Sequence, residues 1–219
     1  MKKVGIGIAI VIIIVAVCVG IYYMLNSNKE ENVDNANQNT LLSNNKNKVE
    51  KENIATEDNE NKILVVYFSA QSHTKSVAEK IADKLNADIF EIVPIDKYTS
   101  DDLDWNDENS RVSKEHEDES LRDIKLEKDT VDNWEEYDTV LIGYPIWWGN
   151  AAWPVNTFVK ANDFNGKTVI PFCTSSSSGL GQSGKLLEEE ANGGNWENGH
   201  RFKSNATDEE INDWIDTIK

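Results

Sequence analysis

Apolar strands alternate with amphipathic helices from residue 63 onward, and this alternation limits the fold more than any other feature. Ile63–Phe68 is a continuous apolar, β-branched run, and apolar residues at helical spacing follow it from Val77 to Leu85. Strands that are apolar on both faces and alternate with helices imply a parallel sheet covered on each side. Further strands are expected near 89–93, 139–144, 168–172 and 199–202, with helices near 153–161, 181–190 and 207–218. We therefore predict a doubly wound α/β domain over residues 63–219.

Residues 96–136, called the acidic segment below, interrupt this rhythm. They hold 16 acidic and 6 basic residues, which predicts a long exposed excursion with some helix. Asp102–Asn106 is weakly similar to a calcium loop. The pattern fails because Asp107 stands at the turn glycine and Ser113 at the twelfth position, so no metal site is predicted.

An apolar run, Val4–Leu25, follows Lys2 and Lys3 at the N-terminus. About 22 residues are enough to cross a bilayer as a helix, so residues 1–25 are predicted to be a transmembrane anchor. A cleaved signal peptide is the alternative, although the run is long for one and lacks a clear cleavage site. A lipoprotein signal around Cys18 is a third option.

Residues 26–62 are rich in Asn, Lys and Glu and show no apolar period, which predicts a disordered linker. Basic residues are denser before the apolar run than directly after it. This bias predicts a cytoplasmic N-terminus and a single-pass cell-membrane protein with its domain on the extracytoplasmic side.

The formal charge of −17 disfavours binding to nucleic acid. Residues 63–219 hold 31 acidic and 15 basic residues, so the excess belongs to the predicted domain, and proteins with basic docking faces are the expected partners. Cys18 and Cys173 stand in different parts of the chain, which excludes a disulfide or a cysteine zinc site within the domain. Cys173 ends a core strand, and no basic residue is expected nearby, so we expect a buried, inert thiol.

Three polar or aromatic loops follow the first, third and fourth predicted strands. In a doubly wound sheet, ligands bind at the carboxyl ends of the strands where the strand order reverses. The first loop, Ser69–Lys75, leads into a helix whose N-terminus can hold a phosphate. An ordinary polar turn capped by Ser72 explains the same residues.

The second loop, Pro145–Pro154, contains three tryptophans, and a planar aromatic ligand would give them a role. One of Trp147 and Trp148 is expected to stack on its ring, and the sequence does not decide which. Trp153 is instead expected to pack beneath the following helix. The third loop, Thr174–Gly179, is a string of small hydrogen-bond donors. It could wrap a polar ring edge, and a flexible linker is the alternative.

Residues 179–185 contain two motifs that are similar to nucleotide-binding loops. Gly179, Gly181 and Gly184 satisfy the dinucleotide-binding spacing, but they follow the fourth strand and not the first. Lys185 nearly completes a phosphate-binding loop, but Leu186 stands where a hydroxyl must hold magnesium. Neither nucleotide site is predicted.

The stretch from Ile63 to Ile218 resembles the flavodoxin-like family. Tyr67–Ala82 resembles the family's first strand, phosphate loop and first helix, Tyr144–Gly149 its second FMN loop, and Thr174–Gly179 its third. The resemblance implies a five-stranded parallel sheet in the order 2-1-3-4-5 and a non-covalently bound FMN. The cofactor-binding residues expected from these loops are Ser69, Gln71, Ser72, His73, Thr74, Lys75, Pro145, Ile146, Trp147, Trp148, Gly149, Asn150, Thr174, Ser175, Ser176, Ser177 and Gly179.

The chain departs from the family pattern at two points. Ser72 and His73 replace the Gly-Asn pair that is common in the phosphate loop, and the third loop lacks the aromatic residue that often covers the outer flavin face. The flavin would then be more open, or covered by the acidic segment. The expected function is electron transfer to redox partners. The alternatives are an NAD(P)H-dependent FMN or quinone reductase and a binding module without flavin.

Overall fold

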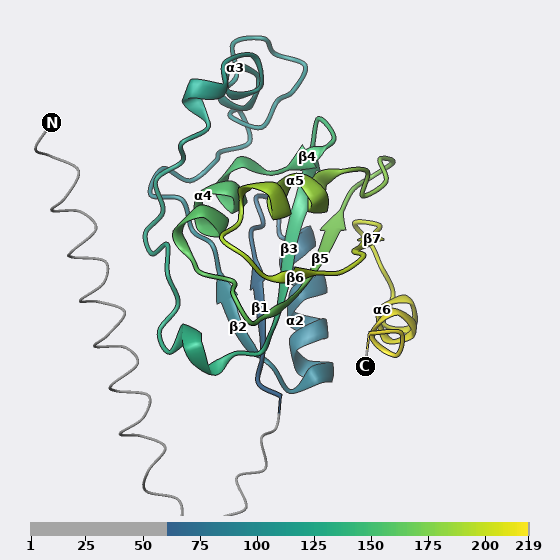
Figure 1. Ribbon diagram of the computed structural model, residues 1–219. Helices are drawn as coiled ribbons and strands as arrows, with labels where there is room; N and C mark the ends of the chain where they lie inside the picture. Colours follow the sequence, from purple (N-terminus) through teal and green to yellow (C-terminus); the bar gives the residue numbers. More distant parts are fainter. Residues whose placement is uncertain (1–60, 219) are drawn as a thin grey trace, which may run out of the picture. The chain divides into compact units, whose positions relative to one another are not determined.

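A computed structural model describes residues 61–218 (Figure 1). The predicted anchor, and all of the predicted linker except Asn61 and Lys62, lie outside these residues. Within the described range, no helix is both long and apolar enough to span a membrane.

The described residues form an α/β fold around one mainly parallel sheet (Figure 1). Its strands are β1 (Ile63–Tyr67), β2 (Asp88–Glu91), β3 (Thr139–Trp147), β4 (Asn150–Ala151), β5 (Thr168–Thr174), β6 (Asn195–Trp196) and β7 (His200–Phe202). Its helices are α2 (His73–Leu85), α3 (Arg111–Glu117), α4 (Trp153–Ala161), α5 (Ser183–Glu190) and α6 (Asp208–Ile215), and two single 3₁₀ turns lie at Glu119–Leu121 and Trp134–Glu136.

Adjacent residues of β1 face two different cores, which explains its continuous apolar run. Leu64 and Val66 pack in the core that includes residues of α4 and α5, whereas Val65 and Tyr67 pack against α2 and α6. Figure 1 shows the same division, with α2 and α4 covering opposite faces of the sheet. The prediction of a sheet buried on both sides is confirmed.

The strand order is β2-β1-β3-β5-β6, with β7 also paired to β5 and β4 antiparallel to β3. The prediction of five parallel strands in the order 2-1-3-4-5 is therefore correct for the central strands and wrong in the strand count. Two short strands share the last position, because the chain leaves β5 after Glu197 and rejoins it at His200. A Cβ on the intervening Gly199 would meet the backbone of Pro171, so the close approach requires glycine there.

The predicted exit loop after the third strand is a β-hairpin, which corrects its expected form. Strand β3 continues to Trp147, and Ile146 and Trp147 pair with Ala151 and Asn150 of β4. Trp148 and Gly149 form the turn with φ of 47° and 82°, the positive values that a two-residue type I′ hairpin needs at both central positions. Tryptophan is an unusual first residue for such a turn, which is why the sequence did not indicate one.

The acidic segment is mostly exposed and contains α3 and both 3₁₀ turns, as expected for an exposed excursion with some helix, but part of it is packed. Its stem is antiparallel, with backbone bonds from Ile95 N to Lys125 O and from Glu127 N to Val93 O, of 2.9 and 2.8 Å. Val112 and Ile124 are buried inside it. The segment therefore has a fixed structure of its own beside the sheet.

Candidate functional site

A cavity of about 530 Å³ lies at the carboxyl ends of β1, β3 and β5. It is the place where a doubly wound sheet binds its ligands, and its volume falls within the roughly 300–1,000 Å³ typical of small-molecule sites. All three polar or aromatic loops contribute to its lining. The lining residues are Ser69, Ala70, Gln71, His73, Thr74, Leu103, Trp105, Val112, Pro145, Ile146, Trp147, Trp148, Thr174, Ser175, Ser176, Ser177, Ser178 and Ser204.

Twelve of the seventeen residues expected to bind the cofactor line this cavity. Of the other five, Lys75 forms an ion pair with Glu91 at 3.5 Å, and Asn150 donates to the carbonyl of Trp148. Gly149 and Gly179 are exposed beside the cavity. Ser72 lies between two lining residues and caps α2 with its backbone only, since its side chain makes no capping bond.

The first loop turns into α2 through a left-handed residue. Ser72 has a φ of 65°, an uncommon value for serine, and such strained positions concentrate at functional sites. The 13-residue helix α2 follows, and its first residues, His73 and Thr74, line the cavity. The free backbone N–H groups of its N-terminus therefore lie at the cavity. The buried hydroxyls of Thr74 and Thr174 bond each other at 2.8 Å and join the first loop to the third. We call this region, the first and third loops together, the hydroxyl end.

Two features of the hydroxyl end depend on residues that the sequence did not single out. Arg201 donates from Nε to Ser175 Oγ at 3.0 Å and from Nη2 to the Ser175 carbonyl at 2.8 Å, so it holds the third loop. Ser204 also lines the cavity. Both come from the C-terminal part of the chain, which the sheet brings beside β5, and no local pattern marks them.

Trp147 and Trp148 also line the cavity, and we call this part of it, formed by the second loop, the aromatic wall. The ring of Trp147 is in edge contact with those of Phe68, Tyr98 and Trp153, at centroid distances of 5.7, 5.0 and 5.9 Å. Trp148 is 39% exposed. Trp153 is buried as the first residue of α4, which confirms its expected structural role.

The acidic segment supplies Leu103, Trp105 and Val112 to the cavity lining. Trp105 is 69% exposed, although it is the bulkiest of the three. The sequence suggested that this segment could cover a ligand but did not mark these residues for the site. An isolated tryptophan among acidic residues is the signal that was available.

Gly184, the last glycine of the dinucleotide-like motif, has a packing role. A Cβ on Gly184 would lie 2.9 Å from Cγ of Pro171, so this glycine lets α5 approach β5. Lys185 bonds Glu188 at 2.9 Å. Cys173 is fully buried, which confirms the expected burial, and burial raises the pKa of its thiol to about 12. The expectation that it lacks a basic neighbour is wrong, because β7 places Arg201 beside it, but that charge lowers the pKa less than burial raises it.

Comparison with known proteins now identifies the fold. The family model described as flavodoxin matches residues 62–218. The chain belongs to the flavodoxin family. A comparison with curated proteins gave no match.

Solved structures agree with this assignment. A protein from Bacteroides uniformis, provisionally described as a flavoprotein, is 42% identical with a TM-score of 0.66, over 71% of this chain and 97% of its own. A similar protein from Bacteroides eggerthii is 40% identical with a TM-score of 0.65, over 72% and 97%. A flavoprotein from Lactobacillus acidophilus, solved in complex with FMN, is 24% identical with a TM-score of 0.52, over 70% and 98%, and shares the fold.

Proposed function

We propose that this flavodoxin is an electron carrier that binds FMN in the cavity at the carboxyl ends of β1, β3 and β5. FMN is the cofactor that the family match and the FMN complex of the Lactobacillus flavoprotein support. The observation that carries the proposal is the convergence of three loops with different chemistry on one cavity. Bound FMN supplies the redox chemistry, and the chain's residues bind and orient it.

The residues present fit this cofactor. The N-terminus of α2 offers backbone N–H groups and partial positive charge to a phosphate, and few cations are needed. Ser69 Oγ is buried beside the cavity with no hydrogen-bond partner among the described residues. It can therefore bond a polar group of a ligand in the cavity. The aromatic wall offers a planar, apolar surface to a flavin ring.

The charge of the domain favours a carrier. With 31 acidic and 15 basic residues between 63 and 219, the negative field opposes the addition of electrons and should lower the reduction potential. The same field would attract a redox partner with a basic docking face and repel a polyanionic nicotinamide cofactor.

Absorption spectroscopy tests this proposal directly. The purified full-length protein should be yellow and should release FMN on acid precipitation, because no covalent link is expected. A colourless protein that does not take up added FMN would refute the proposal and favour a binding module without flavin. Slow oxidation of added NAD(P)H, with and without a quinone, is expected for a carrier.

An NAD(P)H-dependent FMN or quinone reductase is the second candidate. One observation favours it: the acidic segment brings Leu103, Trp105 and Val112 into the cavity lining and so could roof a substrate site. Rapid turnover of NAD(P)H that requires a quinone, and that falls when Trp105 is replaced by Ala, would support the reductase over the carrier.

We further propose that Val4–Leu25 anchors the chain in the cell membrane with the flavodoxin domain on the extracytoplasmic side. Such a domain would acquire FMN after translocation and would need to bind it tightly, since lost cofactor is diluted. Protease added to intact cells or spheroplasts should cleave the chain between anchor and domain and release the domain. A domain that stays protected until lysis would establish the reverse orientation.

A further inference from the structure

The acidic segment contacts all three tryptophans of the hairpin region, each through a different residue. The ring of Tyr98 meets Trp147 at 5.0 Å and 70°, and the ring of His116 stacks on Trp148 at 4.4 Å and 10°. The guanidinium carbon of Arg122 lies 4.4 Å from the ring centre of Trp153.

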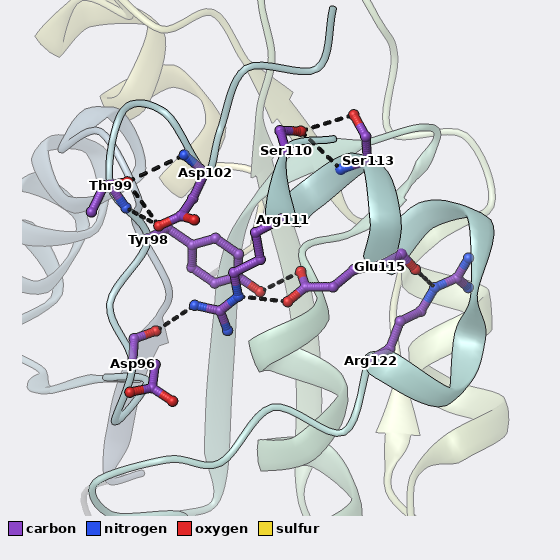
Figure 2. Close-up of polar contacts among 9 residues, drawn as sticks. All are labelled: Asp96, Tyr98, Thr99, Asp102, Ser110, Arg111, Ser113, Glu115 and Arg122. Carbon is purple, nitrogen blue, oxygen red and sulfur yellow. Dashed lines mark hydrogen bonds and ion pairs between the residues drawn. The ribbon is translucent and has the colours of Figure 1, made fainter. Parts of the chain in front are cut away.

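These contacts converge on Glu115, whose side chain is 5% exposed (Figure 2). Its two carboxylate oxygens accept from Tyr98 Oη and from Arg111 Nε, each at 2.7 Å. Its backbone carbonyl accepts from Arg122 Nε at 2.7 Å. Arg122 Nη2 also donates to the carbonyl of His116 at 2.6 Å. Glu115 is therefore bonded directly to two of the contacting residues and adjoins the third.

Arg111 completes the cluster as the counter-ion of Glu115. Its guanidinium lies 3.9 Å from the ring centre of Tyr98 and donates to the carbonyl of Asp96 at 2.7 Å. Burial, reinforced by the bond to Glu115, raises the pKa of Tyr98 above its ordinary value and keeps its hydroxyl a donor. A buried carboxylate with both oxygens bonded holds its partners in one geometry, and removal of its charge would leave Arg111 uncompensated.

The hairpin that carries Trp147 and Trp148 extends past the parallel pairing of β3, which ends at Pro145 and Thr174. Two residue pairs join β3 to β4 in this extension. Trp148 also lies at a positive φ and is 39% exposed. The ring of Trp147 also packs on Phe68 and Trp153, whereas the ring of Trp148 stacks on His116 of the acidic segment, so this segment contributes to the order of both rings.

We propose that Glu115 is a positioning residue that fixes the orientation of the aromatic wall, and through it the flavin ring, although it lines no part of the cavity. This inference rests on the proposed FMN function. The acidic segment would then orient the tryptophans that contact the flavin ring, in addition to covering the cavity.

The test compares Glu115→Gln with Glu117→Gln, the same change at an exposed position of the same helix. The amide has one acceptor oxygen in place of two, so the bond to Arg111 or Tyr98 must be lost or, at the Tyr98 hydroxyl, reversed, and Arg111 loses its counter-ion. For Glu115→Gln, the dissociation constants of FMN and riboflavin should both rise by about tenfold, because the flavin ring is common to both ligands. The visible circular dichroism of the bound flavin should change. Glu117→Gln should match the wild type in all three.

A double-mutant cycle shows whether Glu115 acts through the wall. Glu115→Gln should weaken flavin binding much less in a Trp147→Phe background than in the wild type. Additive effects would overturn the proposal. Unchanged binding and dichroism in Glu115→Gln would do the same, and so would a loss confined to FMN, which would assign the effect to the phosphate.

Two further measurements keep the test decisive. The near-ultraviolet circular dichroism of the FMN-free protein should change in Glu115→Gln and not in Glu117→Gln, which reports on the tryptophans even if the wild type binds no flavin. If Glu115→Gln fails to fold, Tyr98→Phe keeps the Glu115–Arg111 pair and removes one hydrogen bond to the carboxylate. It should raise both dissociation constants about threefold, and unchanged constants would overturn the proposal.

Discussion

The two ends of the cavity are built by different means. The hydroxyl end is formed by short loops that join core strands to helices, and its geometry follows from the sheet and from α2. The aromatic wall stands on a two-pair hairpin and is contacted by the acidic segment, which is not part of the sheet. The shape of the hydroxyl end is therefore set by the strands and helices of the flavodoxin fold. The aromatic wall also depends on side chains of the acidic segment.

Replacement of Trp147 by Ala should have the largest effect, because it removes the centre of the aromatic wall. The variant loses ring contacts with Phe68, Tyr98 and Trp153 as well as the surface offered to the flavin. We expect the free energy of unfolding to fall by about 3 kcal/mol. FMN and riboflavin should both bind about a hundredfold more weakly, judged from the roughly 1–3 kcal/mol per stacked ring found for aromatic platforms.

Denaturant unfolding and flavin fluorescence titration measure these two quantities for Trp147→Ala. If neither flavin affinity nor fluorescence quenching changes, the wall is structural only, and the ring site must be sought elsewhere along the cavity.

Replacement of Thr74 by Ala tests the hydroxyl end. The change removes the 2.8 Å bond to Thr174 and leaves that buried hydroxyl without its partner. The FMN dissociation constant should rise about tenfold and that of riboflavin much less, because the loss lies at the phosphate. Thr74→Ser keeps a hydroxyl and should restore most of the affinity. Equal losses for the two ligands would place Thr74 away from the phosphate and erase the distinction between the ends.

The difference between the two ends also decides what could be predicted from the sequence. Ile63–Phe68 and the helical spacing after it are local patterns, so the amino-acid sequence alone predicts the parallel core and the loop that enters α2. The hairpin at Trp148 was missed because its turn uses tryptophan where Asn or Asp is usual. Arg201, Ser204 and Trp105 reach the cavity region through long-range packing, which no local pattern encodes.

Replacement of Trp105 by Ala should have a smaller effect than either change above. Because Trp105 is 69% exposed, the free energy of unfolding should change by less than about 0.5 kcal/mol. The indole ring of Trp105 is expected to cover the flavin ring at the opening of the cavity. Its loss should lower FMN affinity about threefold, since an aromatic pair contributes roughly 0.5–1.5 kcal/mol beyond burial. Isothermal titration with FMN measures this. A loss as large as that of Trp147→Ala would mean that the acidic segment binds the cofactor directly and does more than support the wall.

The smallest expected effect is an acid sensitivity at the hydroxyl end. His200 packs against Phe202 and Trp214, with centroid distances of 4.6 and 5.5 Å, and stands next to Arg201, which holds the third loop. Burial lowers the pKa of His200 below its ordinary value of 6.5, and the nearby Glu210 only partly opposes this. The folded state therefore binds fewer protons than the unfolded state as the pH falls below about 6.5.

The stabilisation due to neutral His200 is accordingly present above that pH and is lost as the pH falls toward the folded pKa. In FMN-free protein, His200→Gln should reduce the loss of unfolding free energy between pH 7.5 and 5.5, because glutamine does not titrate. Amide hydrogen exchange should show the acid-induced loosening in β7 and in residues 174–178, and His200→Gln should reduce it. Equal slopes for wild type and His200→Gln would contradict the prediction and separate the acid response of the hydroxyl end from His200.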